Sequence, residues 1–332
     1  MEDLMRLEGI ELRFVVNRIS DQLDGHHRVD SICSIKEDSM LFRLRHSAQD
    51  DLFLMVSAFG VWATSLRLGP AGKSVQSALM EEDTPGRDSF GATVKSQYGR
   101  VSLPIVEITP FYDKICDSLL QTRLVGIEQP GTERVAYLTF EGSGGEFVMA
   151  VELSGRGNIM LCSGRPGMEI LALARPVRGK RRALRVGVRY APPPSGSAAG
   201  APDILNLSER DFAGLRGSEI RVWEWLVRRL GLPRKYVGGV LCGMETPHVT
   251  GVELGAGQVR SIFRDTAQLV RAVTAGPHTP CIVRCAMLEN ASPDGFLAVD
   301  VPLGITDLAY ERIPSLMEAL DLVFMVSLSD SW

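Results

Sequence analysis

A segment of twelve residues, 191–202, divides this chain into two parts of different character. Its sequence, APPPSGSAAGAP, places three consecutive prolines before a run of small residues, and this composition is typical of a linker. The 332 residues exceed one average domain and fit two. We therefore expect one domain over 1–190, a linker over 191–202 and a different fold after it.

The part before this linker has mostly β-strand patterns. Apolar residues lie at helical spacing over 4–23, and the residues that follow alternate as in an antiparallel meander that bends near Gly60. Two β-type runs at 135–140 and 147–153 flank the turn EGSGG and predict a hairpin, which NIMLC at 158–162 extends by a third strand.

Two further segments complete this first part. Thr109 followed by Pro110 predicts the start of a helix, because threonine caps helix N-termini and proline is favoured in the first turn. Residues 69–104 are rich in glycine, serine and charge, so we expect an insertion or long loop there.

The part after the linker has mostly helical patterns. Ser208 is a predicted helix cap, a second helix is predicted from Ser218 to Gly231, and Pro233 opens the next. We expect a helical domain over 203–278, and a hairpin with a terminal helix over 279–332. The fold class predicted from these patterns is α+β.

The composition limits where nucleic acid could bind. The net charge is −4 and the sequence pI about 5.8, so any nucleic-acid surface must be a local patch. The opening MEDLMRLEGIEL is acidic and typical of an amphipathic helix rather than a signal peptide, and no apolar run reaches the roughly 20 residues of a membrane span. We expect a cytoplasmic protein with no membrane partner.

Patterns that would indicate an enzyme are absent from the sequence. The six cysteines are scattered and are expected to be buried, and the five histidines are expected to lie in solvated loops, so neither set predicts a metal. GSGGEF lacks the lysine and the following helix of a phosphate loop, and no nucleophile elbow occurs. We expect no cofactor, no metal and no enzymatic activity.

Basic residues gather in three places that could bind phosphate. Arg156 lies between two glycines, in a segment that fits a tight turn and a phosphate site equally well. Seven cations lie between Arg175 and Arg189, and four more surround a predicted turn between two helices. The predicted phosphate-binding residues are Arg156, Arg175, Arg178, Lys180, Arg181, Arg182, Arg185, Arg228, Arg229, Arg234 and Lys235.

Four segments in the same order resemble the signature segments of one family. RLVGIEQPGTERVAYLTF, VELSGRGNIMLC, LRVGVRYAPPP and SLMEALDLVF resemble the amino-terminal domain of NFACT proteins, which are also described as fibronectin-binding-protein-A-like. The resemblance runs from about residue 4 to the end of the chain and is weakest over 69–104. It implies a β-rich lobe like the amino-terminal domain of formamidopyrimidine-DNA glycosylases, followed by a helix-two-turn-helix domain.

The resemblance also implies a function. NFACT proteins are the nascent-chain elongation factors of ribosome quality control, so the implied partners are tRNA and the large ribosomal subunit with a stalled nascent chain. Full-length members continue into a coiled coil and a second RNA-binding domain, which do not occur in these 332 residues. Whether the chain is a fragment or a stand-alone version stays open, as does its capacity for untemplated tailing.

The Gln-Pro-Gly turn carries the residues that the resemblance ties to tRNA. Family members usually have Asp-Arg after this turn, whereas this chain has Glu133 and Arg134. A turn that fixes one anionic and one forked cationic side chain can contact base amines, ribose hydroxyls and phosphate. The predicted tRNA-binding residues are Gln129, Gly131, Glu133 and Arg134.

Two other functions remain as alternatives. The overall acidity and the missing coiled coil also suit a protein-interaction adaptor without RNA binding. An enzyme related to DNA glycosylases is disfavoured, because the chain begins Met1, Glu2, Asp3 and lacks the amino-terminal proline that those enzymes use as nucleophile.

Overall fold

The chain forms two compact units in a computed structural model. The sheet unit comprises Val15–Pro130, Arg134–Pro193 and Leu320–Trp332, and the helical unit comprises Met1–Phe14, Gly131–Glu133 and Pro194–Ala319. The structure describes residues 5–36, 38–68, 93–96, 99–102, 109–179, 182–194, 201–242, 249–285, 295–301 and 308–329. The predicted insertion at 69–104 therefore lies largely outside the described residues.

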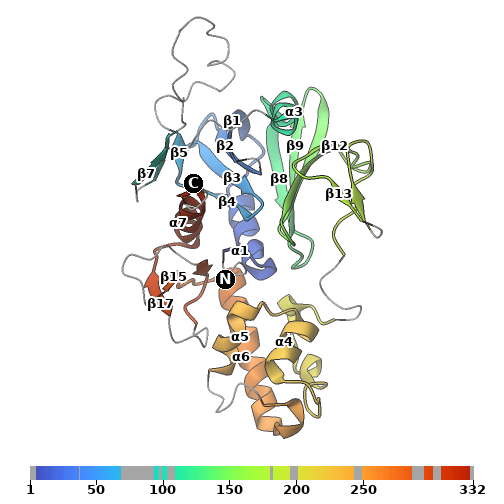
Figure 1. Ribbon diagram of the computed structural model, residues 1–332, viewed down its shortest axis with the longest axis vertical. Helices are drawn as coiled ribbons and strands as arrows, with labels where there is room; N and C mark the ends of the chain where they lie inside the picture. The colour runs from blue at the N-terminus through green and yellow to red at the C-terminus, as the bar shows by residue number, and fades with distance from the viewer. Residues whose placement is uncertain are drawn as a thin grey trace, which may run out of the picture. The chain divides into compact units, whose positions relative to one another are not determined.

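One antiparallel sheet forms the framework of the sheet unit (Figure 1). Within the described residues its nine strands follow the order β12-β11-β10-β9-β8-β1-β2-β3-β4. Their bounds are β1 Arg28–Lys36, β2 Ser39–Arg45, β3 Leu52–Ser57, β4 Gly60–Ala63, β8 Arg123–Glu128, β9 Val135–Gly142, β10 Gly145–Glu152, β11 Asn158–Ser163 and β12 Ile170–Leu173. The predicted meander and the predicted hairpin with its third strand are both confirmed.

Two meanders meet in this sheet at a narrow join. Strands β1 to β4 form the first and β8 to β12 the second, and β1 pairs with β8 only at Arg28 opposite Arg123. The sheet curls strongly and brings its two meanders close to each other. Strand β4 contacts β10, and a side chain at Gly157 would collide with Ala58. The curled face encloses a core that includes Val135, Val148 and Met160.

Helix α3 (Pro110–Leu119) covers one end of the curled sheet and contacts both β1 and β12 (Figure 1). Its beginning is the predicted one, since the Thr109 side chain accepts a hydrogen bond from the backbone N–H of Tyr112. The Tyr112 hydroxyl donates to the Ile32 carbonyl at 2.7 Å, which fastens the helix to β1.

The remaining short strands lie at the edges of the sheet unit. Strands β5 (Arg67–Leu68), β6 (Thr93–Ser96) and β7 (Gly99–Ser102) form a small sheet. Strands β13 (Val177–Arg178) and β14 (Ala183–Leu184) form a two-stranded hairpin within the basic segment. This basic hairpin, defined here as residues 175–185, carries most of the predicted phosphate-binding residues.

Helices α1 (Gly9–Ser20) and α7 (Leu316–Ser329) each have residues in both units. In the sheet unit, Asp321 of α7 accepts hydrogen bonds from the indole of Trp62, the hydroxyl of Thr64, and the backbone and hydroxyl of Ser65. Burial raises the pKa of Asp321, and these hydrogen bonds offset part of the rise. The terminal helix is confirmed and is bound to β4 and the residues after it.

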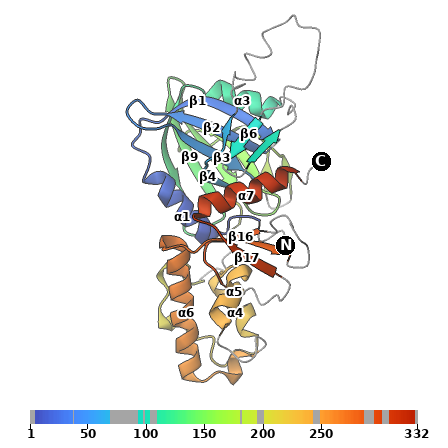
Figure 2. The same ribbon diagram turned by 90° about the vertical axis from the view of Figure 1, so that its left-hand side faces the viewer.

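The helical unit is built on three helices, α4 (Val222–Leu230), α5 (Arg234–Leu241) and α6 (Ala256–Ala275), as Figure 2 shows. Short 3-10 helices at Ile204–Asn206, Glu209–Phe212 and Gly251–Glu253 accompany them. Gly231 ends α4 at a φ of 72°, as a glycine at this position predicts. Phe212 packs against Trp225 at 5.5 Å between ring centroids, and both side chains are buried.

Two details of the helical unit differ from the prediction. Helix α4 begins at Val222 rather than Ser218, because Arg221 forms a β-bridge with Thr250 and the N–H of Val222 bonds the Val249 carbonyl. The predicted hairpin is present as β15 (Cys281–Cys285) and β16 (Gly295–Leu297), but β17 (Leu308–Arg312) pairs with β15 as an unpredicted third strand.

Each unit is built from three separate segments of the chain, whereas the expected domains were continuous in sequence. The passage between Pro193 and Pro194 falls within the expected linker, whereas the first residues of the chain and the β15–β17 sheet belong to the helical unit. Residues 131–133 also belong to that unit. The sequence around the Gln-Pro-Gly turn is therefore shared between the two units.

Candidate nucleic-acid interface

The predicted tRNA-binding residues of the Gln-Pro-Gly turn divide between the units. In the sheet unit, Gln129 is buried, and a guanidinium N–H of Arg134 donates to the Leu153 carbonyl at 3.1 Å. The Leu153 N–H in turn donates to the Arg134 carbonyl at 2.8 Å. Arg134 is therefore half-buried, and its side chain is fastened to the end of β10.

In the helical unit, the rest of the turn packs against the start of α1. The guanidinium of Arg13 donates to the Gly131 carbonyl, and a side chain at Gly9 would collide with the Thr132 carbonyl. Gly131 has a φ of 50°, in the left-handed region where glycine costs least. Glu133 is half-buried, so the acid is held by its surroundings rather than carried on an open turn.

The basic hairpin contains two arginines that hold the fold together. Arg182 forms an ion pair with Glu152 of β10, and the two side chains are 16% and 6% exposed. Burial would lower the pKa of Arg182, but the hydrogen bond and charge of Glu152 raise it above its usual range. The Tyr190 hydroxyl donates to the same carboxylate at 2.9 Å, and burial raises its pKa far above normal.

Arg175 fastens the other end of the hairpin. Its guanidinium forms an ion pair with Asp38, and it also donates to the Arg156 carbonyl at 3.0 Å. The side-chain amide of Asn158 donates to the Arg175 carbonyl at 2.7 Å and is itself almost fully buried. Arg175 and Arg182 therefore have structural partners, although both were predicted to bind phosphate.

Other basic residues of this region face solvent. Arg156, Arg178 and Arg185 are exposed, and no carboxylate of the described residues lies within ion-pair distance of them. The Arg156 turn lies beside the base of the hairpin, since its carbonyl accepts from Arg175. Lys180 and Arg181 fall outside the described residues, so their prediction is neither supported nor opposed.

The predicted phosphate contact of the helical unit is only partly available. Arg228, Arg229 and Arg234 are exposed at the turn between α4 and α5. Arg228 pairs with Glu224 at 2.8 Å, and the Arg234 guanidinium lies 6.0 Å from the centroid of the half-buried Trp223 ring. These three side chains can reach a ligand from solvent.

Lys235 is wrong as a predicted phosphate contact. Its side chain is 2% exposed and its ammonium lies 2.8 Å from Glu11 of α1, which is fully buried. The Tyr236 hydroxyl donates to the same Glu11 carboxylate and accepts from the Ala298 N–H at 3.0 Å. The lysine turns inward because an acid 224 positions earlier in the chain neutralises it, which no local pattern reveals.

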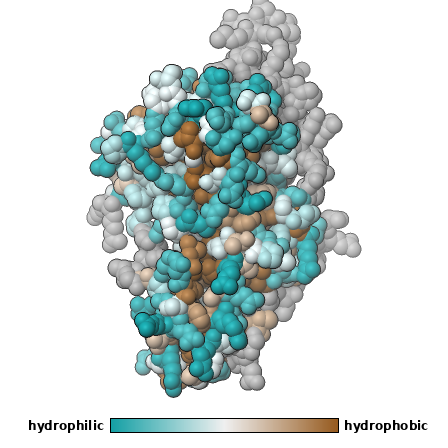
Figure 3. All heavy atoms as spheres, turned by 180° about the vertical axis from the view of Figure 1, so that it is seen from behind, coloured by the Kyte–Doolittle hydropathy of each residue, from teal (hydrophilic) through white to brown (hydrophobic). Residues whose placement is uncertain are grey.

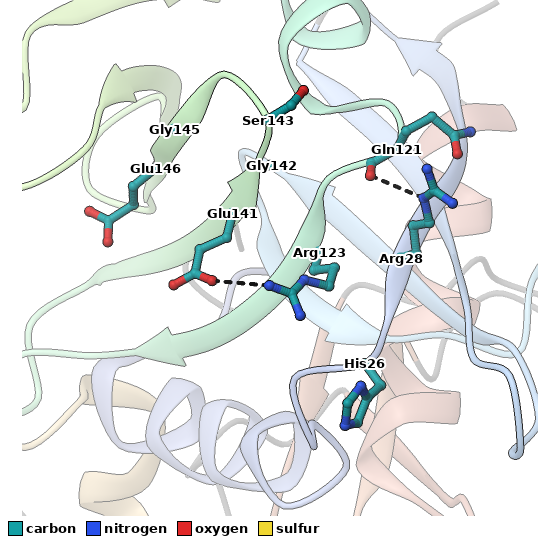
Figure 4. A pocket seen from close by; sticks show the side chains of 9 residues that line it. All are labelled: His26, Arg28, Gln121, Arg123, Glu141, Gly142, Ser143, Gly145 and Glu146. Carbon is teal, nitrogen blue, oxygen red and sulfur yellow. Dashed lines mark hydrogen bonds and ion pairs between the residues drawn. The ribbon is translucent and has the colours of Figure 1, made fainter.

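The structure also shows a surface hollow that sequence reasoning missed. A recess of about 660 Å³ opens in the sheet unit between the start of β1 and the β9–β10 hairpin (Figure 4). Arg28, Arg123 and Glu141 contribute to its lining, and an adjoining hollow of about 260 Å³ shares His26, Arg28 and Gln121. Its residues come from separate strands, so the only signal in the sequence was their individual charge.

Two histidines near this recess differ from the expected solvated residues. His27 is 2% exposed and lies 3.5 Å from Asp24, and burial lowers its pKa. The His46 side chain is 5% exposed and contacts the same carboxylate at 2.9 Å. The two imidazole rings face each other with centroids 4.9 Å apart, and Asp24 lies within ion-pair distance of both.

The described residues contain no group of three or more histidine, cysteine, aspartate or glutamate side chains arranged to hold a metal ion. Cys33, Cys116, Cys162 and Cys281 are buried as expected, whereas Cys242 is exposed.

Hydrophilic side chains cover most of the face seen in Figure 3. Over the described part of the chain, every helix is too short or too polar to traverse a bilayer.

Comparisons with known proteins agree with the fold. A fibrinogen binding protein from Staphylococcus aureus is similar over 95% of this chain and 97% of its own, with a TM-score of 0.62 and 14% identity. The N-terminal part of a fibronectin/fibrinogen-binding protein from Streptococcus suis is similar over 96% of this chain and 99% of its own, with a TM-score of 0.60 and 14% identity. These likenesses show a shared fold.

No curated protein matches the chain. The family model described as NFACT N-terminal and middle domains matches residues 109–330, which is well over half of the chain. Both the hairpin at β9–β10 and the helices after the linker fall within the matched range. The chain therefore belongs to the NFACT family and carries its N-terminal and middle domains.

Proposed function

We propose that this chain is a non-enzymatic RNA-binding module of ribosome quality control. Its ligands are tRNA and the large ribosomal subunit carrying a stalled nascent chain, and its role is to support untemplated tailing. Family membership supports the setting. The observation that carries the RNA-binding role is the anchored basic hairpin: on a chain of net charge −4, it has exposed arginines with no acid partner among the described residues.

The anchoring of the hairpin is what makes its open arginines useful. Arg175 is fixed by Asp38 of the β1–β2 turn and Arg182 by Glu152 of β10, so the positions of Arg178 and Arg185 are set before a ligand arrives. A guanidinium binds phosphate through two parallel N–H donors, and less affinity is lost when the side chain starts from an ordered base. Arg156 adds a third cation beside the base of the hairpin.

Two other regions supply further contacts in this proposal. Glu133 and Arg134 at the Gln-Pro-Gly turn contact tRNA with the part of their surface that stays exposed. Arg228, Arg229 and Arg234 contact a phosphate backbone from the helical unit, without Lys235. The basic hairpin contributes most of the salt-sensitive affinity, because its cations are the least neutralised.

Binding of labelled total tRNA over a range of salt concentrations tests the proposal. The three contacts of Arg156, Arg178 and Arg185 alone predict a slope of log affinity against log salt of about −2 to −3, and contacts from the helical unit make it steeper. Arg178→Gln/Arg185→Gln should reduce the magnitude of this slope by nearly one per lost contact, and Glu133→Ala/Arg134→Ala should lower affinity at every salt concentration. The matched control is Arg260→Gln/Arg271→Gln, which removes the same charge from exposed positions of α6.

The control variant should bind like the unchanged chain. If all variants lose affinity equally, the interaction reflects general charge and the hairpin is not the site. If the unchanged chain does not bind tRNA at low salt, the RNA-binding role is wrong.

Protein binding is the second candidate function. Two proteins that share the fold are described as binding fibrinogen, one of them also fibronectin. At 14% identity this likeness does not transfer a ligand. A protein partner would bind with a weak salt dependence and would be insensitive to the loss of Arg178 and Arg185, so the same experiment separates the two functions.

A further inference from the structure

Three arginines lie side by side across three neighbouring strands of the sheet unit. Arg28 of β1 is directly opposite Arg45 of β2 on one side and Arg123 of β8 on the other. Residues directly opposite each other in an antiparallel sheet project to the same face. We call Arg45, Arg28 and Arg123 the arginine row.

The pairing of Arg28 with Arg123 is of the closer kind. Backbone hydrogen bonds join the residues on either side of the pair, from Leu124 to His27 at 2.9 Å and from Val29 to Thr122 at 2.8 Å. The pair is therefore a non-hydrogen-bonded one, in which opposite side chains approach most closely. Like charges directly opposite each other destabilise a sheet, so the row has a cost that the fold alone does not explain.

Acidic neighbours neutralise the outer members of the row but not its centre. Arg45 pairs with Asp30 at 3.1 Å, and Arg123 pairs with Glu141 at 3.4 Å. Arg28 instead donates from Nε to the Gln121 carbonyl at 3.1 Å, and no carboxylate of the described residues lies within ion-pair distance of it. Arg28 is exposed, and it is the member of the row that has no acid partner among the described residues.

Arg28 lines both hollows, and Figure 4 shows it among the residues of the larger one. The larger hollow has about 660 Å³, within the range of small-molecule sites. Its wall contains the amide of Gln121, the hydroxyl of Ser143 and the carboxylates of Glu141 and Glu146.

This mixture of charges defines the kind of ligand. One unneutralised guanidinium fits a single phosphate, which it can bind through two N–H donors. The carboxylates nearby disfavour a continuous polyanion, but they accept hydrogen bonds from hydroxyl and amine groups. We propose that the recess binds one nucleotide, with its phosphate on Arg28 and its sugar or base against Gln121, Ser143 and Glu141.

The proposal does not depend on the basic hairpin, so its test is separate. Titration calorimetry of the unchanged chain with adenosine 5′-monophosphate, adenosine and inorganic phosphate comes first. We expect the nucleotide to bind at least tenfold more tightly than adenosine. Equal affinity for the two, or no binding of the nucleotide, overturns the proposal without any variant.

Variants of the row then assign the phosphate contact. Arg28→Gln should lose at least tenfold in nucleotide affinity, and Arg28→Lys should lose part of it, because lysine keeps the charge but not the fork. The melting temperature of Arg28→Gln should be unchanged or higher, since a repulsion is relieved. The charge-matched control, Arg271→Gln on α6, should leave nucleotide binding unchanged.

Other outcomes of these variants would contradict the assignment. Nucleotide affinity that survives in Arg28→Gln would show that the guanidinium does not hold the phosphate. If Arg28→Gln does not fold, the bond to Gln121 is structural, and Arg123→Gln becomes the deciding variant, with unchanged affinity counting against the row.

A tRNA arm identifies the source of the nucleotide. Competition between tRNA and adenosine 5′-monophosphate, lost in Arg28→Gln, would indicate a nucleotide of the RNA. Binding of the nucleotide unaffected by tRNA would indicate a free mononucleotide. Arg178→Gln/Arg185→Gln should weaken tRNA but not mononucleotide binding, so this proposal and the RNA-binding function can fail independently.

Discussion

Two arginines of the basic hairpin differ from two others in the same run. Arg182 pairs with Glu152 of β10 and Arg175 pairs with Asp38 in the β1–β2 turn, whereas Arg178 and Arg185 are exposed and have no acid partner among the described residues. All four look alike in the sequence, in one run of basic residues. The comparison shows that a basic run consists of anchors and of binding residues, and that only the acids decide which is which.

The arginine row shows the same distinction across strands rather than along one. Arg45 and Arg123 have acid partners, and Arg28 between them has none among the described residues. In both regions an unneutralised arginine stands next to neutralised ones. The neutralised residues keep the local charge tolerable for the fold, and the remaining one supplies the attraction for an anion.

The largest expected loss of unfolding free energy follows from replacing Arg182. Arg182→Ala leaves Glu152 buried without a cation, and breaking a buried pair in this way typically costs about 3–5 kcal/mol of unfolding free energy. Denaturant unfolding measures it, with Arg185→Ala as the matched exposed control. A loss below about 1 kcal/mol would mean that Tyr190 alone satisfies Glu152, and that Arg182 is not an anchor.

A smaller effect is expected for Arg175. Its side chain is 37% exposed and Asp38 is 9% exposed, so solvent screens part of their interaction. A double-mutant cycle with Arg175→Ala and Asp38→Ala should give a coupling of about 1–2 kcal/mol. A coupling energy near zero would mean that Asp38 does not anchor Arg175. Arg175 would then belong with the arginines that are open to a ligand.

The smallest effect is expected for the open arginines. Arg178→Gln should change the free energy of unfolding by no more than about 0.5 kcal/mol, because the side chain is exposed and has no ion pair among the described residues. Thermal unfolding of this variant beside Arg182→Ala measures the contrast directly. A destabilisation of Arg178→Gln comparable to that of Arg182→Ala would remove the basis for treating the two as different.

Features that depend on nearby residues were predictable from the sequence. The helix that starts after Thr109, the hairpin at EGSGG and the end of α4 at Gly231 all occur where the local pattern places them. Capping, turn formation and a positive φ involve residues only a few positions apart. The α+β class followed from the same local signals.

Features that depend on distant residues were not predictable in this way. Helix α4 starts later than its serine suggests because Arg221 pairs with Thr250, and β17 joins a hairpin across residues that carry no signal for it. The recess was not predictable either, because residues of β1, β8 and the β9–β10 hairpin, far apart in the sequence, come together to line it. A charged residue in the sequence does not reveal the strand that will lie opposite it.

The sequence by itself determined the types of the elements, the family resemblance and the total charge of this chain. The tertiary structure decided which basic residues face solvent. Lys235 turned inward to Glu11, Arg182 reached Glu152 and Arg175 reached Asp38, while Arg28 and Arg178 stayed open. The physical reason is that burying a charge is favourable only with a partner, and here the partners come from other strands and helices.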